Sequence, residues 1–258
     1  MDLGLNGKKV LITGGSKGIG LACARAFMAE GAKVAIVSRS QENLNQARTL
    51  LGNAYTATAD LIDAAAAAAM VEKVEKEFGP IDVLVNSAGA AKRTNADDLT
   101  PEAWRAAMDA KYFTYIHVID PLVKRMAARG SGVIVNIIGS GGKIASPIHL
   151  AGGSANAALM LATAGLANAY AAKGVRVVGI NPGLTNTSRV SEGLKADAKR
   201  EGISEDEALA RARKKLPLGR LAEPGEIADI AVFAASARGR FLTGANISAD
   251  GVSTPTVV

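Results

Sequence analysis

The stretch "LITGGSKGIG", residues 11–20, carries glycines at a spacing suited to binding phosphate. It follows a segment with strand character and opens one with helical character. Gly14, Gly18 and Gly20 let the backbone turn sharply and approach a pyrophosphate, while the first N–H groups of the helix attract its charge. The sequence therefore predicts a dinucleotide site here, against the alternative of a glycine turn without a ligand.

The end of the second apolar segment indicates which dinucleotide is bound. An acidic residue about 20 positions after the glycine loop would bind the ribose 2′-hydroxyl of NAD. The segment instead ends "IVSRS", with Ser38 and Arg39, and Lys17 lies in the glycine loop. Two cations and a hydroxyl suit a 2′-phosphate, so we expect NADP(H). The alternative is that Lys17 and Arg39 are ordinary surface charges.

Composition favours one large domain that spans residues 1–258. The chain has 258 residues, of which 48% are hydrophobic. No run of about 18 apolar residues is uninterrupted, so no membrane span is expected. Cys23 is the single cysteine, which suits a reducing cytoplasm. The net charge of +6 is spread along the chain without a basic and aromatic stripe, so no nucleic-acid partner is expected.

Short apolar runs alternate with helical segments along the chain. The runs predicted to be strands are 8–14, 33–39, 54–60, 82–89, 132–140, 175–183 and 245–251. The segments predicted to be helical are 18–30, 62–78, a long one that opens at Pro101, 153–173 and 188–215. Pro121 is expected to kink or interrupt the long helix. The alternation predicts an α/β fold, a single-domain doubly wound parallel sheet with helices on both faces.

Several motifs together resemble the short-chain dehydrogenase/reductase family. They are "TGGSKGIG" (13–20), "NSAG" (86–89), "NPG" (181–183) and Asp60, and the similarity covers essentially the whole chain. The resemblance implies a Rossmann-like fold, hydride transfer between the nicotinamide and a small-molecule carbonyl or alcohol, a substrate lid at 184–220, and a homodimer or homotetramer. The residues expected to bind the cofactor are Gly14, Ser16, Lys17, Gly18, Ile19, Gly20, Ser38, Arg39, Asp60, Leu61, Asn86, Ala88, Gly89, Pro182, Gly183, Thr185 and Thr187.

The catalytic residues that the resemblance implies are largely replaced. Such enzymes use a serine to polarise the carbonyl, a tyrosine as acid/base, and a lysine and an asparagine that support the tyrosine. Ser140 matches the serine position. Gly152 stands at the tyrosine position, Asn156 at the lysine position and Lys111 at the asparagine position. A tyrosine titrates near 10 unless a cation lowers its pKa, so the usual proton donor and its activator are both missing.

Three residues are candidates for the missing chemistry, and the acid/base could be Lys111, His149 or an ordered water. Lys111 and Asn156 could exchange the two usual positions and keep one ammonium and one amide near the nicotinamide ribose. The alternative is that Lys111 points to solvent and Asn156 lines a helix. His149, three residues before Gly152, could donate a proton near neutral pH, although a structural role is the ordinary one for a lone histidine. The chain could thus be a reductase with an unusual site, an inactive nucleotide-binding or regulatory protein, or an enzyme with non-redox chemistry.

Fluorescence titration tests the cofactor prediction. Because the cations at Lys17 and Arg39 match a 2′-phosphate, the protein should bind NADPH more tightly than NADH. Tighter binding of NADH would contradict the assignment.

Overall fold

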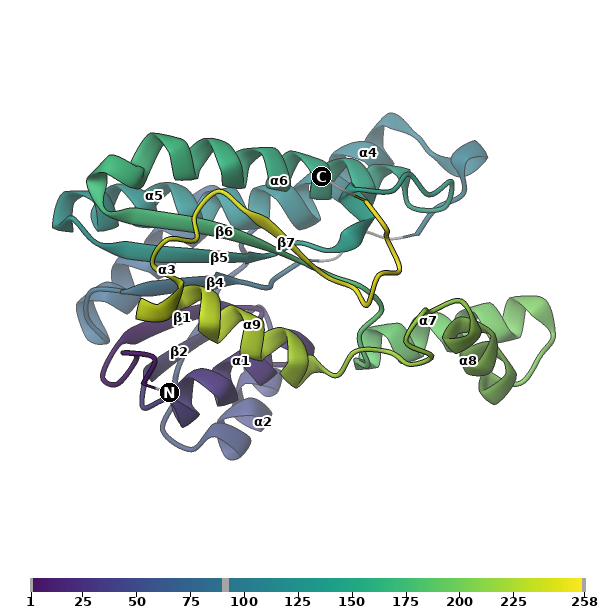
Figure 1. Ribbon diagram of the computed structural model, residues 1–258, viewed down its shortest axis with the longest axis horizontal. Helices are drawn as coiled ribbons and strands as arrows, with labels where there is room; N and C mark the ends of the chain where they lie inside the picture. The colour runs from purple at the N-terminus through teal and green to yellow at the C-terminus, as the bar shows by residue number, and fades with distance from the viewer. Residues whose placement is uncertain (1, 90–92, 257–258) are drawn as a thin grey trace.

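A seven-stranded, wholly parallel sheet forms the centre of the protein in a computed structural model that describes residues 2–89 and 93–256 (Figure 1). The strand order is β3-β2-β1-β4-β5-β6-β7. The strands are β1 (Lys9–Thr13), β2 (Lys33–Ser38), β3 (Tyr55–Thr58), β4 (Val83–Asn86), β5 (Gly132–Ile137), β6 (Val175–Pro182) and β7 (Asn246–Ala249). All seven predicted strands are present, and the doubly wound α/β fold is confirmed.

Helices cover both faces of the sheet because the strands are apolar on both faces. Val10 and Ile12 face one core while Leu11, between them, faces the other. The first core is closed by α1 (Gly18–Ala29), α2 (Gln41–Leu51) and α9 (Pro224–Ala235). The second is closed by α3 (Ala64–Glu77), α5 (Thr114–Arg129) and α6 (Leu150–Tyr170). The helices α2 and α9 were not among the predicted segments.

The long helical segment before β5 is broken, but not at its proline. It consists of α4 (Pro101–Ala107), a π-helical turn η2 (Met108–Phe113) and α5. Pro121 was expected to kink or interrupt the helix; the interruption is wrong, because α5 continues through the proline, and the kink stays a prediction. Ile119 and Leu122, on either side of the proline, are buried in the core, and this packing offsets the hydrogen bond that proline removes.

The segment predicted as one helix over 188–215 forms two. They are α7 (Ser188–Glu201) and α8 (Glu205–Lys214), separated at Gly202, whose φ of 67° ends the first helix. Figure 1 shows the pair standing away from the sheet, beyond the ends of the strands. Short 3-10 turns complete the secondary structure: η1 (Ala96–Asp98), η3 (Ser140–Gly142), η4 (Ala171–Lys173) and η5 (Ala237–Gly239).

One helical stretch, Leu150–Lys173, is long and apolar enough to cross a membrane by length and composition alone. Its apolar character has another explanation here. Ala155, Leu159 and Ala167 of α6 are buried, and Leu159 and Ala167 belong to the core that this helix shares with the sheet. A helix that packs on a sheet needs such a face in any globular domain.

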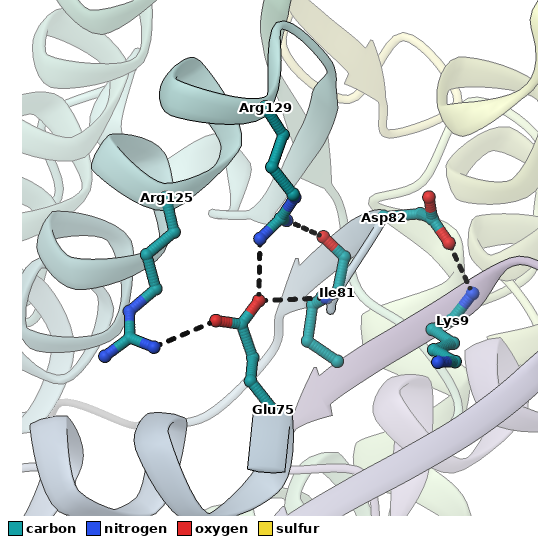
Figure 2. A network of polar contacts seen from close by, with 6 residues as sticks. All are labelled: Lys9, Glu75, Ile81, Asp82, Arg125 and Arg129. Atoms are coloured by element: carbon teal, nitrogen blue, oxygen red, sulfur yellow. Dashed lines mark hydrogen bonds and ion pairs between the residues drawn. The ribbon is translucent and has the colours of Figure 1, made fainter. Parts of the chain in front are cut away.

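A carboxylate joins α3 and α5 to the chain just before β4, at the amino ends of the strands (Figure 2). Glu75 of α3 accepts hydrogen bonds from Arg125 (3.1 Å), from Arg129 (3.0 Å) and from the backbone N–H of Ile81 (3.0 Å). Its side chain is only 10% exposed. Because these contacts lie just before β4 begins, they set where that strand enters the sheet and have no place in the chemistry.

Replacing this carboxylate should destabilise the fold without affecting nucleotide binding. Glu75→Gln leaves two guanidinium groups without their charged partner and should lower the free energy of unfolding by about 1–3 kcal/mol in urea denaturation. The exposed Glu72→Gln on the same helix is the control and should change stability by less than about 0.5 kcal/mol. Equal stability of the two variants would show that the network is not structurally important.

Candidate functional site

A cleft of about 600 Å³ runs across the carboxyl ends of the strands, where β1 and β4 lie side by side and the order of the strands reverses. This is the position where open α/β sheets bind ligands. Of the residues expected to bind the cofactor, the cleft is lined by Gly14, Ser16, Lys17, Gly18, Ile19, Ser38, Arg39, Asp60, Leu61, Ala88, Gly89, Pro182, Gly183, Thr185 and Thr187. The structure thus brings them together from the ends of five strands, β1, β2, β3, β4 and β6, and the loops that follow them.

The glycine loop has the backbone geometry that a phosphate site requires. Gly14 has a φ of 65°, and a Cβ placed there would lie 2.8 Å from Cα of Ala88. A Cβ on Gly20 would lie 2.3 Å from the carbonyl oxygen of Gly14, so this residue packs behind the cleft rather than on its wall. Helix α1 begins at Gly18, with no side chain capping its first N–H groups. Those groups are available to an anion.

Lys17 and Arg39 both line the cleft and are both exposed. Neither forms an ion pair with a carboxylate in the part of the chain that the structure describes. Asp60 lines the same cleft, and its Oδ1 accepts a hydrogen bond from the N–H of Ile62. The cleft therefore presents two unneutralised cations, which fits a phosphate group on the ribose.

Asn86 supports the cleft from inside the sheet. Its Oδ1 accepts from the hydroxyl of Thr13 (3.2 Å), and its Nδ2 donates to Oδ1 of Asn136 (3.1 Å). Asn136 in turn donates to the hydroxyl of Thr163 on α6 (3.0 Å). All four side chains are buried, so Asn86 positions the strand ends and does not line the cleft.

A second hollow, of about 790 Å³, adjoins the cleft and has room for a substrate. The two spaces share five lining residues: Gly89, Lys111, Ile138, Arg189 and Val190. The wall of the second hollow also includes His149, Gly152 and Asn156, and its outer side is formed by α7 and α8. The residues whose catalytic roles the sequence leaves open thus lie together beside the cofactor cleft.

Lys111 is buried between the two spaces, which overturns the alternative that it points to solvent. It lies in the π-helical turn η2 and is 8% exposed. Its Nζ donates to the hydroxyl of Tyr115 (2.8 Å) and to the carbonyl oxygen of Ile137 (2.9 Å). Both partners are uncharged. Burial, and then the positive charge of Arg189, lower the pKa of Lys111 from 10.5 to about 7.

His149 and Asn156 both face the second hollow. His149 precedes the first turn of α6, and its Nδ1 is buried without a hydrogen-bond partner among the described residues. Burial, then the charges of Arg93 and Lys111, lower the pKa of His149 below its usual value. Asn156 is buried on the next turns of the same helix. Lys111 and Asn156 thus line one hollow, although only Lys111 also lines the cofactor cleft, and the exchange of their positions stays a prediction.

Ser140, the predicted catalytic serine, does not line the cleft. Ser140 begins η3 and is half-buried, while Gly139, one residue earlier, lines the cleft. Gly139 has a φ of 122°, and a Cβ there would lie 3.3 Å from Nδ2 of Asn156. The carbonyl-polarising role of Ser140 stays a prediction.

Sequence reasoning missed two residues of the site. Tyr115 is fully buried and holds Lys111 in place, and its hydroxyl also donates to the carbonyl of Ile137. The spacing of four between Lys111 and Tyr115 puts both on one helical face and could have revealed the pair. Arg189 donates to the carbonyl of Gly89 (3.1 Å) across the cleft. Nothing in its local sequence indicates this contact.

Comparisons with known proteins agree with the fold. A family model described as short chain dehydrogenase matches residues 8–198. The chain is 32% identical to D-threitol dehydrogenase of Mycolicibacterium smegmatis, covering 97% of this chain and 94% of that one. It is 34% identical to acetoacetyl-CoA reductase of Shinella zoogloeoides, covering 93% and 96%. The structure of L-sorbose reductase from Gluconobacter frateurii with NADPH and L-sorbose superposes with a TM-score of 0.93 over 100% of both chains, at 30% identity.

The burial of Lys111 should reduce stability in a pH-dependent way. Below pH 7 the amine is charged in both states, and the folded protein bears the cost of burying it; between pH 7 and 10.5 the folded protein releases that proton and the cost shrinks. Lys111→Met should therefore raise the free energy of unfolding by about 1–3 kcal/mol at pH 6 and by less at pH 9. Urea unfolding at both pH values measures this. A variant less stable than wild type at pH 6 would contradict the burial cost.

Proposed function

Because the chain belongs to the short chain dehydrogenase family, we propose that it is an NADP(H)-dependent oxidoreductase that reduces a carbonyl compound or oxidises the alcohol, with Lys111 as acid/base. The observation that carries this proposal is the position of Lys111. It is buried on the wall shared by the cofactor cleft and the substrate hollow, with a pKa of about 7. A group of that pKa can give or take a proton at neutral pH.

The free cations at Lys17 and Arg39 support the choice of NADP(H). Guanidinium and ammonium groups bind phosphate oxygens through charge-assisted hydrogen bonds. The glycine loop and the uncapped start of α1 suit the pyrophosphate. The relative that acts on L-sorbose was solved with NADPH, which agrees with this choice.

The bound nicotinamide supplies or accepts the hydride, and the protein must move the proton. In the direction of reduction, the ammonium of Lys111 gives one proton to the carbonyl oxygen and becomes a neutral amine. In the direction of oxidation, the neutral amine takes the hydroxyl proton. Tyr115 and the carbonyl of Ile137 hold Nζ at the wall through either step, because an amine and an ammonium can both donate to them.

His149 is a weaker candidate for the acid. The lowering of its pKa leaves its imidazole neutral at pH 7, and a neutral imidazole is a poor proton donor. It can accept a hydrogen bond from a substrate hydroxyl or relay a proton to solvent. Asn156, on the same wall, offers an amide that orients the substrate or the ribose.

One observation favours a second function, a nucleotide-binding protein without turnover. Among the described residues, no tyrosine lines either space. Tyr115, which contacts Lys111, cannot serve as the missing proton donor. Burial raises the pKa of Tyr115 well above its usual value, so its hydroxyl keeps its proton. If Lys111 does not transfer a proton, the protein would still bind NADPH but turn over no substrate.

Kinetics with NADPH and a carbonyl panel test the role of Lys111. Lys111→Met should lower kcat by about 10²- to 10⁴-fold, the usual contribution of a general acid, and should leave the Kd for NADPH within a few fold. In wild type, kcat/KM for reduction should fall as pH rises through about 7 and that for oxidation should rise, because reduction needs the ammonium and oxidation the amine.

The exposed Lys124→Met on α5 is the matched control and should behave as wild type. Turnover and a pH profile unaffected by Lys111→Met would exclude this lysine as the acid/base. Binding of NADPH with no turnover of any substrate would favour the second function.

A further inference from the structure

The substrate hollow has a strongly positive wall. Its charged lining residues are Arg93, Lys111, Arg189, Glu201, Arg211 and Lys215, of which only Glu201 is acidic. They come from four separate parts of the chain: the loop after β4, the π-helical turn, and the two helices α7 and α8. The positive charge is therefore a property of the hollow and not of one basic helix.

Some of this charge has no counter-charge within the described residues. Arg211 is neutralised, because it pairs with Glu201 (3.1 Å) and Glu207 (2.7 Å). Arg189 donates to the carbonyl of Gly89, and Lys111 donates to a hydroxyl and a carbonyl, all of them uncharged. Lys215 is exposed and forms no ion pair in the described part of the chain.

These cations face the same space and repel one another. Burial is the main cause of the lowered pKa of Lys111 and of His149; the charge of Arg189 adds to the first shift, and the charges of Arg93 and Lys111 add to the second. Like charges that line one space disfavour each other's charged forms. A ligand with a negative group would relieve the repulsion, whereas a neutral ligand would leave it in place.

We propose that the hollow binds a substrate that carries an oxyanion, a carboxylate or a phosphate, in addition to the carbonyl or hydroxyl that reacts. The proposal rests on the function proposed above and adds the chemical class of the substrate. The reactive group lies toward Lys111, on the wall shared with the cofactor cleft, and the oxyanion lies toward Arg189 and Lys215.

The chemistry of the side chains suits this arrangement. Guanidinium binds carboxylate and phosphate through two parallel hydrogen bonds, and lysine binds either as a point charge. The bound anion would also offset the charge of Arg189 beside Lys111. The ammonium would then be favoured in the presence of substrate, which is the form that reduction requires.

Anion binding can be measured without turnover. Isothermal titration of the NADPH-saturated protein with malonate and with inorganic phosphate should show binding of at least one of them, because NADPH already fills the phosphate sites of the cleft. Lys215→Gln should weaken this binding by about threefold to tenfold, as expected for an exposed cation. Arg189→Gln should weaken it by about tenfold or more.

Lys214→Gln is the matched control. Lys214 precedes Lys215 at the same end of α8, is equally exposed, and does not line the hollow. Its substitution should leave the affinity unchanged. Equal weakening by Lys214→Gln and Lys215→Gln would show a diffuse surface effect and would overturn the proposal, as would the absence of any anion binding.

Turnover of matched substrates distinguishes the sources of the anion. Acetoacetate is compared with its methyl ester, and dihydroxyacetone phosphate with dihydroxyacetone. A kcat/KM at least tenfold higher for the anionic member of one pair, reduced in Lys215→Gln but not in Lys214→Gln, supports the proposal and identifies carboxylate or phosphate. Preference for the neutral members overturns it. Anion binding at the hollow without any turnover would support the anion site while the proposed oxidoreductase function fails.

Discussion

The close approach of two loops, one after β1 and one after β4, is the constraint on which the site depends. Gly14 lies so near the second loop that a side chain at this position would meet the backbone of Ser87 and Ala88. The hydroxyl of Thr13 accepts hydrogen bonds from the N–H groups of Ser87 and Ala88 and donates to Asn86. From Asn86 the buried chain of hydrogen bonds passes through β5 to α6. The helix that carries Asn156 is thus held by the same network that shapes the nucleotide end.

The burial that lowers the pKa of Lys111 also reduces the stability of the fold. Removal from water lowers its pKa into the neutral range, and the same removal destabilises its charged form. Tyr115 and the carbonyl of Ile137 satisfy its hydrogen bonds without neutralising its charge. A carboxylate in their place would have stabilised the ammonium and restored a high pKa. The acid/base that we propose therefore owes its lowered pKa mainly to burial among neutral partners, whereas the resemblance to the family implied a cation beside a tyrosine.

Most of the fold could be predicted because the signals are local. Each strand is a short apolar run, and the glycine loop stands between a strand and a helix. The helices α2 and α9 were missed because α2 is polar on most of its surface and α9 follows a stretch, 215–223, without regular secondary structure. For the site, the lining of the cofactor cleft followed from motifs. The environment of Lys111 did not, because its burial depends on Ile137 and Arg189, which lie 26 and 78 positions further along the chain.

The π-helical turn at Met108–Phe113 has a consequence for how the protein tolerates changes in chain length. A π turn accommodates an additional residue compared with an α-helix, so the helical segments on its two sides are out of phase. Deleting one residue there would allow a regular helix to form and would rotate the preceding segment by about 100° relative to α5. Lys111 would then no longer keep its present direction relative to the core face of α5. The position of Lys111 thus depends on the number of residues in this turn as well as on their identity. Substitutions, which keep the chain length constant, would not reveal this dependence.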